Sequence, residues 1–170
     1  DMSWGHFANY YMPPYKAAMD AGAATFMSAF NDFNNEPSTG NEALLRKLLK
    51  DEWAFTGFVV SDWASVQEMI PHRYAADEKE AAYKAIKAGL DMEMVSECYR
   101  NNLADLVKDK KVDVKLIDDA VRRILIKKYE LGLFDDPFRY CDENREKNII
   151  NSKSMRDEAR YVSERAIVLL

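Results

Sequence analysis

The sequence contains little of what marks a metal-binding or disulfide-rich domain. Its 170 residues include only two cysteines, Cys98 and Cys141, and two histidines, His6 and His72. The cysteines lie far apart and match no metal-ligand spacing, which argues against a disulfide scaffold and against a zinc site. We therefore expect free thiols, no metal and no cofactor, and we assign no proton-transfer role to either histidine.

Long apolar runs and dense basic clusters are also missing. No run approaches the roughly 18 residues that a membrane-spanning helix needs, and the first residues lack the basic-then-apolar order of a signal peptide. The chain starts at Asp1 without an initiator Met, so we expect any targeting sequence to belong to a longer precursor. A net charge of −5 without a basic cluster argues against nucleic acid as a partner, and we expect no membrane partner.

Apolar and aromatic residues are plentiful, at 48% and 12% of the chain, which is enough for a globular core. Residues 57–63, Gly-Phe-Val-Val-Ser-Asp-Trp, join a short apolar run to a carboxylate and an indole. Such a run predicts a strand buried on both faces in the middle of a parallel sheet. Asp62 and Trp63 then lie where the strand emerges, which is the active face of an α/β barrel.

Three strand-and-helix units follow one another at a similar spacing. The pattern predicts strands over 23–30, 57–63 and 90–94, with helices in the intervals at about 41–52, 64–70 and 77–88. Parallel strands need such crossovers, which are nearly always right-handed, so the units form part of a doubly wound sheet or of a barrel. A complete eight-stranded barrel takes about 250 residues, so a barrel would be only partly present.

Helix boundaries are indicated by caps and prolines. Pro13 and Pro14 suit a helix start, so we expect a short helix over about 14–21. Capping boxes are predicted at 39–42, with Thr39 as the cap, and at 77–80. Gly89 fits the left-handed residue that ends a helix.

The second half of the chain is predicted to be helical. Helices are expected over about 97–108 and over 114–131, the second capped by Asp113 and ended by Gly132. Its buried stripe is predicted from periods of three and four at Ile117, Val121, Ile124, Leu125 and Lys128.

Residues 133–151 have little apolar periodicity and predict a linker between two domains. We accordingly divide the chain into 1–132, the linker 133–151 and 152–170. The last part begins as an amphipathic helix and finishes on Ala-Ile-Val-Leu-Leu, which is typical of a core strand and leads us to expect that the chain ends in mid-domain.

Asp62 and Trp63 each have two interpretations when taken alone. An aspartate at a strand end is either catalytic or the N-cap of the following helix. A tryptophan there is either a flat wall for a sugar ring or an ordinary core residue. The joint pattern of strand, carboxylate and indole is more specific than either residue.

Several motifs together resemble glycoside hydrolase family 3, in particular its bacterial β-glucosidases. In order along the chain they are Thr-Phe-Met-Ser-Ala-Phe-Asn at 25–31, Leu-Leu at 44–45, Asp-Glu-Trp-Ala-Phe at 51–55, 57–63 itself, Ala-Gly-Leu-Asp-Met at 88–92 and Leu-Gly-Leu-Phe-Asp-Asp-Pro at 131–137. The resemblance covers essentially the whole chain.

The resemblance implies an α/β fold, the C-terminal portion of a (β/α)₈ TIM-like barrel, followed by a linker and the start of an α/β sandwich domain. It implies a retaining, exo-acting enzyme that takes a β-linked oligosaccharide or glucoside, and it suggests a periplasmic or secreted location. Asp62 matches the family's nucleophile and Trp63 an aromatic that borders the leaving-group subsite. The Ser-Asp-Trp form makes the N-acetylglucosaminidase branch a poorer match.

Retaining chemistry also needs a second carboxyl group about 5 to 5.5 Å from the nucleophile. The family takes it from its second domain, here beyond Leu170, and takes other sugar-binding residues from strands that would precede Asp1. Within this sequence Asp91 and Glu93, on the following strand, are the nearest candidates, with structural contacts as the alternative. We expect the 170-residue chain to be inactive alone.

Phe30 departs from the family's pattern, because many members have a tyrosine there whose hydroxyl bonds the nucleophile. We place Phe30 among the substrate-binding residues, with simple packing as the alternative. The competing hypothesis for the whole chain is a non-catalytic α/β module for carbohydrate binding or interaction. Exposed strand edges of a partial barrel are expected to pair with the rest of a parent protein or with a second copy.

Overall fold

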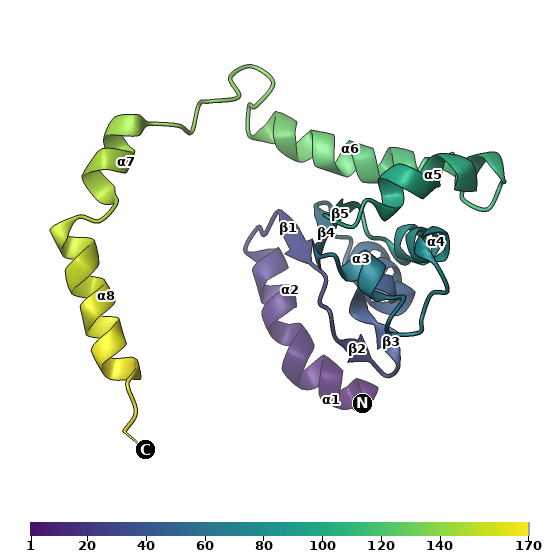
Figure 1. Cartoon of the computed structure of the whole chain (residues 1–170), viewed down its shortest axis with the longest axis horizontal. Coiled ribbons are helices and arrows are strands. Elements are labelled where there is room, and N and C mark those ends of the chain that lie inside the picture. The colour runs from purple at the N-terminus through teal and green to yellow at the C-terminus, as the bar shows by residue number, and fades with distance from the viewer. Residues whose placement is uncertain (170) are drawn as a thin grey trace. The chain divides into compact units, whose positions relative to one another are not determined.

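A computed structural model describes residues 1–169, which fall into two compact units, one over 1–131 and the other from Gly132 onward. The first unit is a small parallel sheet with helices packed on it (Figure 1). The second unit is helical. The further division of the second unit into a linker and the start of a domain stays a prediction.

The sheet has three parallel strands, β1 (Thr25–Met27), β4 (Phe58–Trp63) and β5 (Met92–Met94), in the order β1-β4-β5. Thr25 pairs with Phe58 and Val60 pairs with Met92, so β4 is the central strand. The predicted parallel arrangement is therefore confirmed, although β1 and β5 are shorter than the sequence pattern suggested. A separate antiparallel pair, β2 (Asp32–Phe33) and β3 (Glu36–Pro37), forms the loop after β1.

Helices precede β1, fill the intervals between the strands and follow β5. They are, in chain order, α1 (Trp4–His6), η1 (Phe7–Tyr11), α2 (Met12–Asp20), η2 (Ser38–Gly40), η3 (Ala43–Glu52), α3 (Ser65–Glu68), α4 (Glu78–Ala88), α5 (Cys98–Lys108) and α6 (Val114–Glu130). The second unit contains α7 (Glu143–Ile149) and α8 (Lys153–Ala166). No helix in the described part of the chain is long and apolar enough to cross a membrane.

The N-terminal helix begins earlier than predicted, at Trp4 rather than near Pro14. The two prolines lie in the first turn of α2, where their missing N–H groups are not needed. The preceding turn, η1, is a π-helix, closed by a hydrogen bond from the Met12 N–H to the Phe7 carbonyl. This wider turn carries the helix into the prolines without a break.

The helices cover one face of the sheet and leave the other open. Val59 on β4 is fully buried beneath the helices, within the apolar core. On the opposite face Met27, Val60 and Met92 lie side by side, and Met27 and Met92 are 52% and 45% exposed. The expectation that β4 is buried on both faces is therefore wrong for this chain, because its helices supply only one layer.

The caps were predicted correctly at two of three helices. The Asp77 carboxylate accepts the Glu80 N–H at the start of α4, and Asp113 accepts the Lys115 N–H at the start of α6. At η3 the prediction was wrong, because Asn41 Oδ1 accepts the Leu44 N–H and Thr39 is buried elsewhere. Gly89, with φ of +104°, ends α4 as expected.

The buried face of α6 is only partly the predicted one. Ile117 packs against the core, but Val121 and Leu125 are exposed. Ala120 is buried instead, and Arg123 is largely shielded beside it. Arg123 lies on the buried side of α6 because it donates hydrogen bonds to the Phe55 and Gly57 carbonyls, in the loop before β4. Apolar periodicity alone does not reveal these contacts, so the predicted stripe differs from the observed buried face.

In the second unit, α8 begins at Lys153, where the amphipathic pattern predicted a helix, and Ser152 caps it. Residues 167–169 are not in a strand, whereas Leu170 lies outside the described residues. Cys98 and Cys141 are free thiols, as predicted. Burial raises the pKa of the Cys98 thiol to about 12, so this cysteine is protonated at any ordinary pH.

Candidate active site at the carboxyl end of the sheet

Asp62 lies near the carboxyl end of the central strand and is partly buried. Its Oδ1 accepts the N–H of Trp63 at 2.7 Å. The following helix, α3, starts three residues later at Ser65 and has no side-chain cap. The N-cap interpretation of Asp62 therefore fails, and the carboxylate is left for another role.

The backbone around Asp62 is irregular. Val60 pairs with Met92 and Trp63 pairs with Met94, so β4 uses one residue more than β5 between these two points. This is a β-bulge, a feature that re-aims side chains and is common beside active sites. Immediately after it Ala64 adopts a left-handed conformation, with φ of +56°.

The two aromatic residues of the predicted site are both accessible. Trp63 is 62% exposed, so the core interpretation of this tryptophan is not met in this chain. Phe30 follows β1, the neighbour of β4, and is 37% exposed. Since carboxyl ends of parallel strands lie at one edge of a sheet, the three predicted residues come from one edge.

Three buried hydroxyl groups that the sequence analysis missed form a structural cluster. Thr39 Oγ1 lies 2.9 Å from both Ser28 Oγ and Ser65 Oγ, and it donates to the Ala29 carbonyl at 3.2 Å. They join the end of β1, the loop after it and the start of α3. No local pattern reveals this cluster, because its members are distant in sequence.

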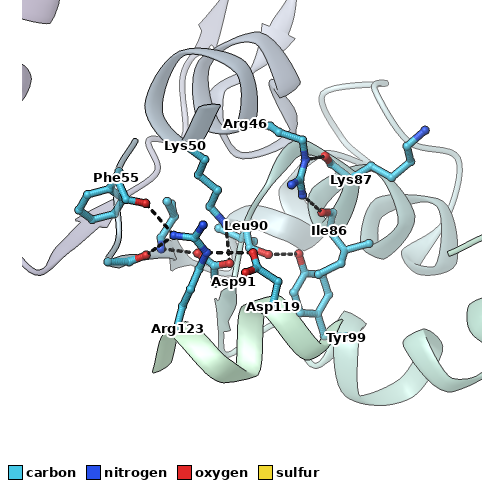
Figure 2. A network of polar contacts seen from close by, with 12 residues as sticks. Arg46, Lys50, Phe55, Ile86, Lys87, Leu90, Asp91, Tyr99, Asp119 and Arg123 are labelled. Atoms are coloured by element: carbon cyan, nitrogen blue, oxygen red, sulfur yellow. Dashed lines mark hydrogen bonds and ion pairs between the residues drawn. The ribbon is translucent and has the colours of Figure 1, made fainter. Parts of the chain in front are cut away.

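The amino-terminal end of the sheet has a very different polar network (Figure 2). Lys50 Nζ from η3 lies 2.5 Å from Asp91 Oδ1, and the two side chains are only 3% and 2% exposed. The other carboxylate oxygen, Oδ2, accepts the Val59 N–H at 2.8 Å. Asp91 thus binds η3 to the middle strand.

Burial and pairing act on this ion pair in opposite directions. Burial raises the pKa of the Asp91 carboxyl and lowers the pKa of the Lys50 ammonium. The Asp91 carboxylate opposes the lowering of the Lys50 pKa, and the Lys50 ammonium opposes the raising of the Asp91 pKa. The hydrogen bond from the Val59 N–H also lowers the pKa of Asp91. Burial is the larger cause for both groups, and the mutual hydrogen bond offsets part of the cost of burying the two charges.

Arginines bind backbone carbonyls around the pair. Arg123 from α6 donates to the Phe55 and Gly57 carbonyls at 2.7 and 2.9 Å, and its Nε pairs with Asp119 (Figure 2). Arg46 similarly donates to the last carbonyls of α4. These contacts hold the loop that enters β4 and the end of α4.

Asp91 and Glu93, the two candidates for a second carboxyl group, both have structural contacts. Asp91 belongs to the buried pair at the opposite end of β4. Glu93 Oε1 accepts the Tyr99 N–H at 2.7 Å, in the first turn of α5. Burial raises the pKa of the Glu93 carboxyl, and its Oε2 is buried without a hydrogen-bond partner.

The described residues contain no group of three or more His, Cys, Asp or Glu side chains that would hold a metal ion. The predicted site combines a strand-end carboxylate with an exposed indole. These are the two kinds of group that glycoside hydrolases use, a carboxylate for attack on the sugar and an aromatic ring as a wall against it.

Comparison with known proteins gives the family. The family model described as the glycosyl hydrolase family 3 N terminal domain matches residues 1–126, and the chain belongs to this family. Over its whole length it is 42% identical to a periplasmic β-glucosidase of Salmonella typhimurium and 34% identical to a β-xylosidase of Formosa agariphila. It spans 23% and 24% of the lengths of these proteins.

Solved structures agree. The crystal structure of a β-glucosidase from Listeria innocua superposes with a TM-score of 0.87 at 40% identity, over 94% of this chain and 22% of that one. The same enzyme in complex with glucose gives a TM-score of 0.86. The expected resemblance to β-glucosidases of this family is confirmed, and the chain corresponds to less than a quarter of each of these relatives.

Proposed function

We propose that the chain is a segment of a longer retaining, exo-acting β-glucosidase-type enzyme and that Asp62 is its nucleophile. The observation that carries the proposal is the Asp62 carboxylate itself. It lies on a bulge near the carboxyl end of the central parallel strand, caps no helix and stands next to an exposed tryptophan. Family membership supports the same assignment.

In the proposed mechanism an Asp62 carboxylate oxygen bonds to the anomeric carbon, and the glycosidic oxygen leaves with the electrons of the broken bond. A second carboxylic acid protonates that oxygen and later, as a base, activates the water that hydrolyses the glycosyl-enzyme. Since Asp91 and Glu93 have structural contacts, this second carboxyl comes from outside the 170 residues. Trp63 and Phe30 form apolar walls for the sugar.

The open face of the sheet supports the larger architecture. Exposed methionines beside Val60 leave apolar surface without a cover, and both outer strands have a free edge among the described residues. We propose that further strands of a parent chain complete a (β/α)₈ barrel, with the second unit leading into an α/β sandwich domain. A second copy of the chain is the alternative partner.

The substrate class is proposed as β-glucosides or related β-linked oligosaccharides. The names of relatives include both β-glucosidases and β-xylosidases, which differ in the sugar that is released. Two aryl substrates, a β-glucoside and a β-xyloside, would distinguish these possibilities in a longer enzyme that contains the segment. The 170-residue chain is expected to hydrolyse neither.

Mechanism-based labelling tests the nucleophile. In 2-deoxy-2-fluoro-β-glucosyl fluoride, attack of the carboxylate at the anomeric carbon expels fluoride and leaves a slowly hydrolysed glycosyl-enzyme. We expect peptide mass spectrometry of the longer enzyme to find the sugar on Asp62. Labelling of another residue would refute the assignment, whereas sugar binding without any labelling would favour the carbohydrate-binding module.

A further inference from the structure

Ser61, immediately before the proposed nucleophile, has a fully buried side chain with two hydrogen bonds. Its Oγ accepts the N–H of Met94, on the neighbouring strand β5, at 2.7 Å. The same hydroxyl donates to the carbonyl of Asp62 at 2.9 Å. One hydroxyl thus connects β5 to the backbone of Asp62.

These bonds lie within the bulge. Because β4 has an extra residue between Val60 and Trp63, its backbone does not follow the regular ladder with β5 there. The Met94 N–H donates to the Ser61 side chain, and the Met94 carbonyl accepts the Ala64 N–H at 2.9 Å. The Ser61 hydroxyl therefore supplies the contact that closes the bulge against β5.

The Asp62 carbonyl and the Trp63 N–H belong to the same planar peptide group. The Ser61 hydroxyl holds the carbonyl side of this plane, and the N–H side donates to Asp62 Oδ1 at 2.7 Å. Rotating the plane would therefore move the carboxylate. A continuous chain of contacts runs from β5 through Ser61 to the carboxylate.

We propose that Ser61 is a positioning residue that sets the direction of the Asp62 carboxylate through the Asp62–Trp63 peptide plane. The proposal rests on the proposed function of Asp62. It differs from a purely structural role, in which the hydroxyl only satisfies buried polar groups. A structural role would change the stability of the enzyme, whereas a positioning role changes the rate of attack by enzyme that is still folded.

The test compares Ser61→Ala with Ser61→Thr and Ser28→Ala in a longer enzyme that contains the segment. Thr keeps the hydroxyl. Ser28 is the matched control, because its buried hydroxyl lies at the end of the adjacent strand and bonds Thr39 rather than the bulge. The rate of labelling by 2-deoxy-2-fluoro-β-glucosyl fluoride is measured as a function of its concentration, well below each variant's unfolding temperature.

For Ser61→Ala we expect the limiting rate of labelling to fall by about 10- to 100-fold, because small misplacements of a reacting group have effects of this size. The concentration that gives half of that rate should change little. Ser61→Thr should label faster than Ser61→Ala, and Ser28→Ala should label at the unmodified rate even if it melts earlier. Wild-type labelling rates in folded Ser61→Ala would overturn the proposal.

Two further outcomes keep the test decisive. If Ser61→Ala does not fold, Ser61→Cys replaces it, since a thiol of similar shape donates and accepts only weakly; an unchanged rate in that variant would also overturn the proposal. If the unmodified enzyme is labelled elsewhere than at Asp62, it is the proposed function that fails, and this result is seen before any Ser61 variant is made.

Discussion

The two ends of β4 are built in opposite ways. At the amino-terminal end, Lys50 and Asp91 form a buried ion pair, and Asp91 and Arg123 also form hydrogen bonds with backbone groups. At the carboxyl end, Asp62 is partly exposed, sits on a bulge and takes part in none of the ion pairs among the described residues.

Under the proposed function, this difference separates stability from chemistry along a single strand. In α/β barrels the carboxyl face carries reacting groups and the opposite face serves stability. A charge that is paired and buried holds elements together but is out of reach of a substrate. An accessible carboxylate adds little to the free energy of folding and can contact a substrate. We therefore expect substitutions at the carboxyl end of β4 to reduce activity and substitutions at the amino-terminal end to reduce stability.

The largest effect is expected at the carboxyl end. Asp62→Asn keeps the shape of the side chain but removes the nucleophilic oxygen, so we expect the kcat of a longer enzyme on an aryl β-glucoside to fall by about 10⁴-fold or more. The free energy of unfolding should change by less than about 0.5 kcal/mol, as for other accessible positions. Near-normal turnover would remove Asp62 from its proposed role.

The amino-terminal end should show the reverse. Asp91→Ala leaves the Lys50 ammonium buried without its partner, so we expect a loss of about 3–5 kcal/mol in the free energy of unfolding, measured by urea denaturation. Asp119→Ala is the matched control: its partially exposed pair with Arg123 should contribute less than about 1 kcal/mol, and Arg123 keeps its two carbonyl acceptors. Equal losses in both variants would contradict the contrast.

Much of the carboxyl end could be read from the sequence, because its signals are local. The apolar run before Asp62 predicted the strand, and the order of strands and helices predicted the parallel sheet. Trp63 is exposed, which is compatible with its interpretation as a wall for a sugar ring and not with its interpretation as a core residue. The bulge was not predicted, because it depends on the register between β4 and β5, which no stretch of a single strand encodes.

The polar contacts at the amino-terminal end could not be predicted from the sequence. Lys50 and Asp91 are distant in the chain, and nothing in either neighbourhood indicates the other. Arg123 interrupts an apolar stripe and would ordinarily face solvent, so periodicity placed Val121 and Leu125 inside instead. Similarly, Thr39 matched a capping box but is engaged by hydroxyls from two other elements. Polar contacts with residues distant in the sequence decided the positions of all four residues.

The pH dependence of a Lys50→Met variant would sharpen the contrast further, with a smaller effect. Met fills a similar volume but removes the cation that lowers the pKa of Asp91, so only the Val59 N–H and the nearby Arg123 still oppose the burial that raises it. The folded variant therefore holds the Asp91 proton at pH values where the unfolded chain, with an ordinary pKa of 3.8, has lost it.

The contribution of Asp91 to the stability of the variant is therefore greatest below pH 3.8 and is lost as the pH rises through the raised pKa of the folded state. The difference in urea midpoint from the unmodified chain should thus be larger at about pH 8 than at about pH 5. Adding Asp91→Asn removes the titrating group from the variant, so in the double variant this difference should change less between the two pH values than in Lys50→Met. A constant difference for Lys50→Met alone would mean that Asp91 does not take up a proton when its partner is removed, and that water or Arg123 stabilises its charge instead.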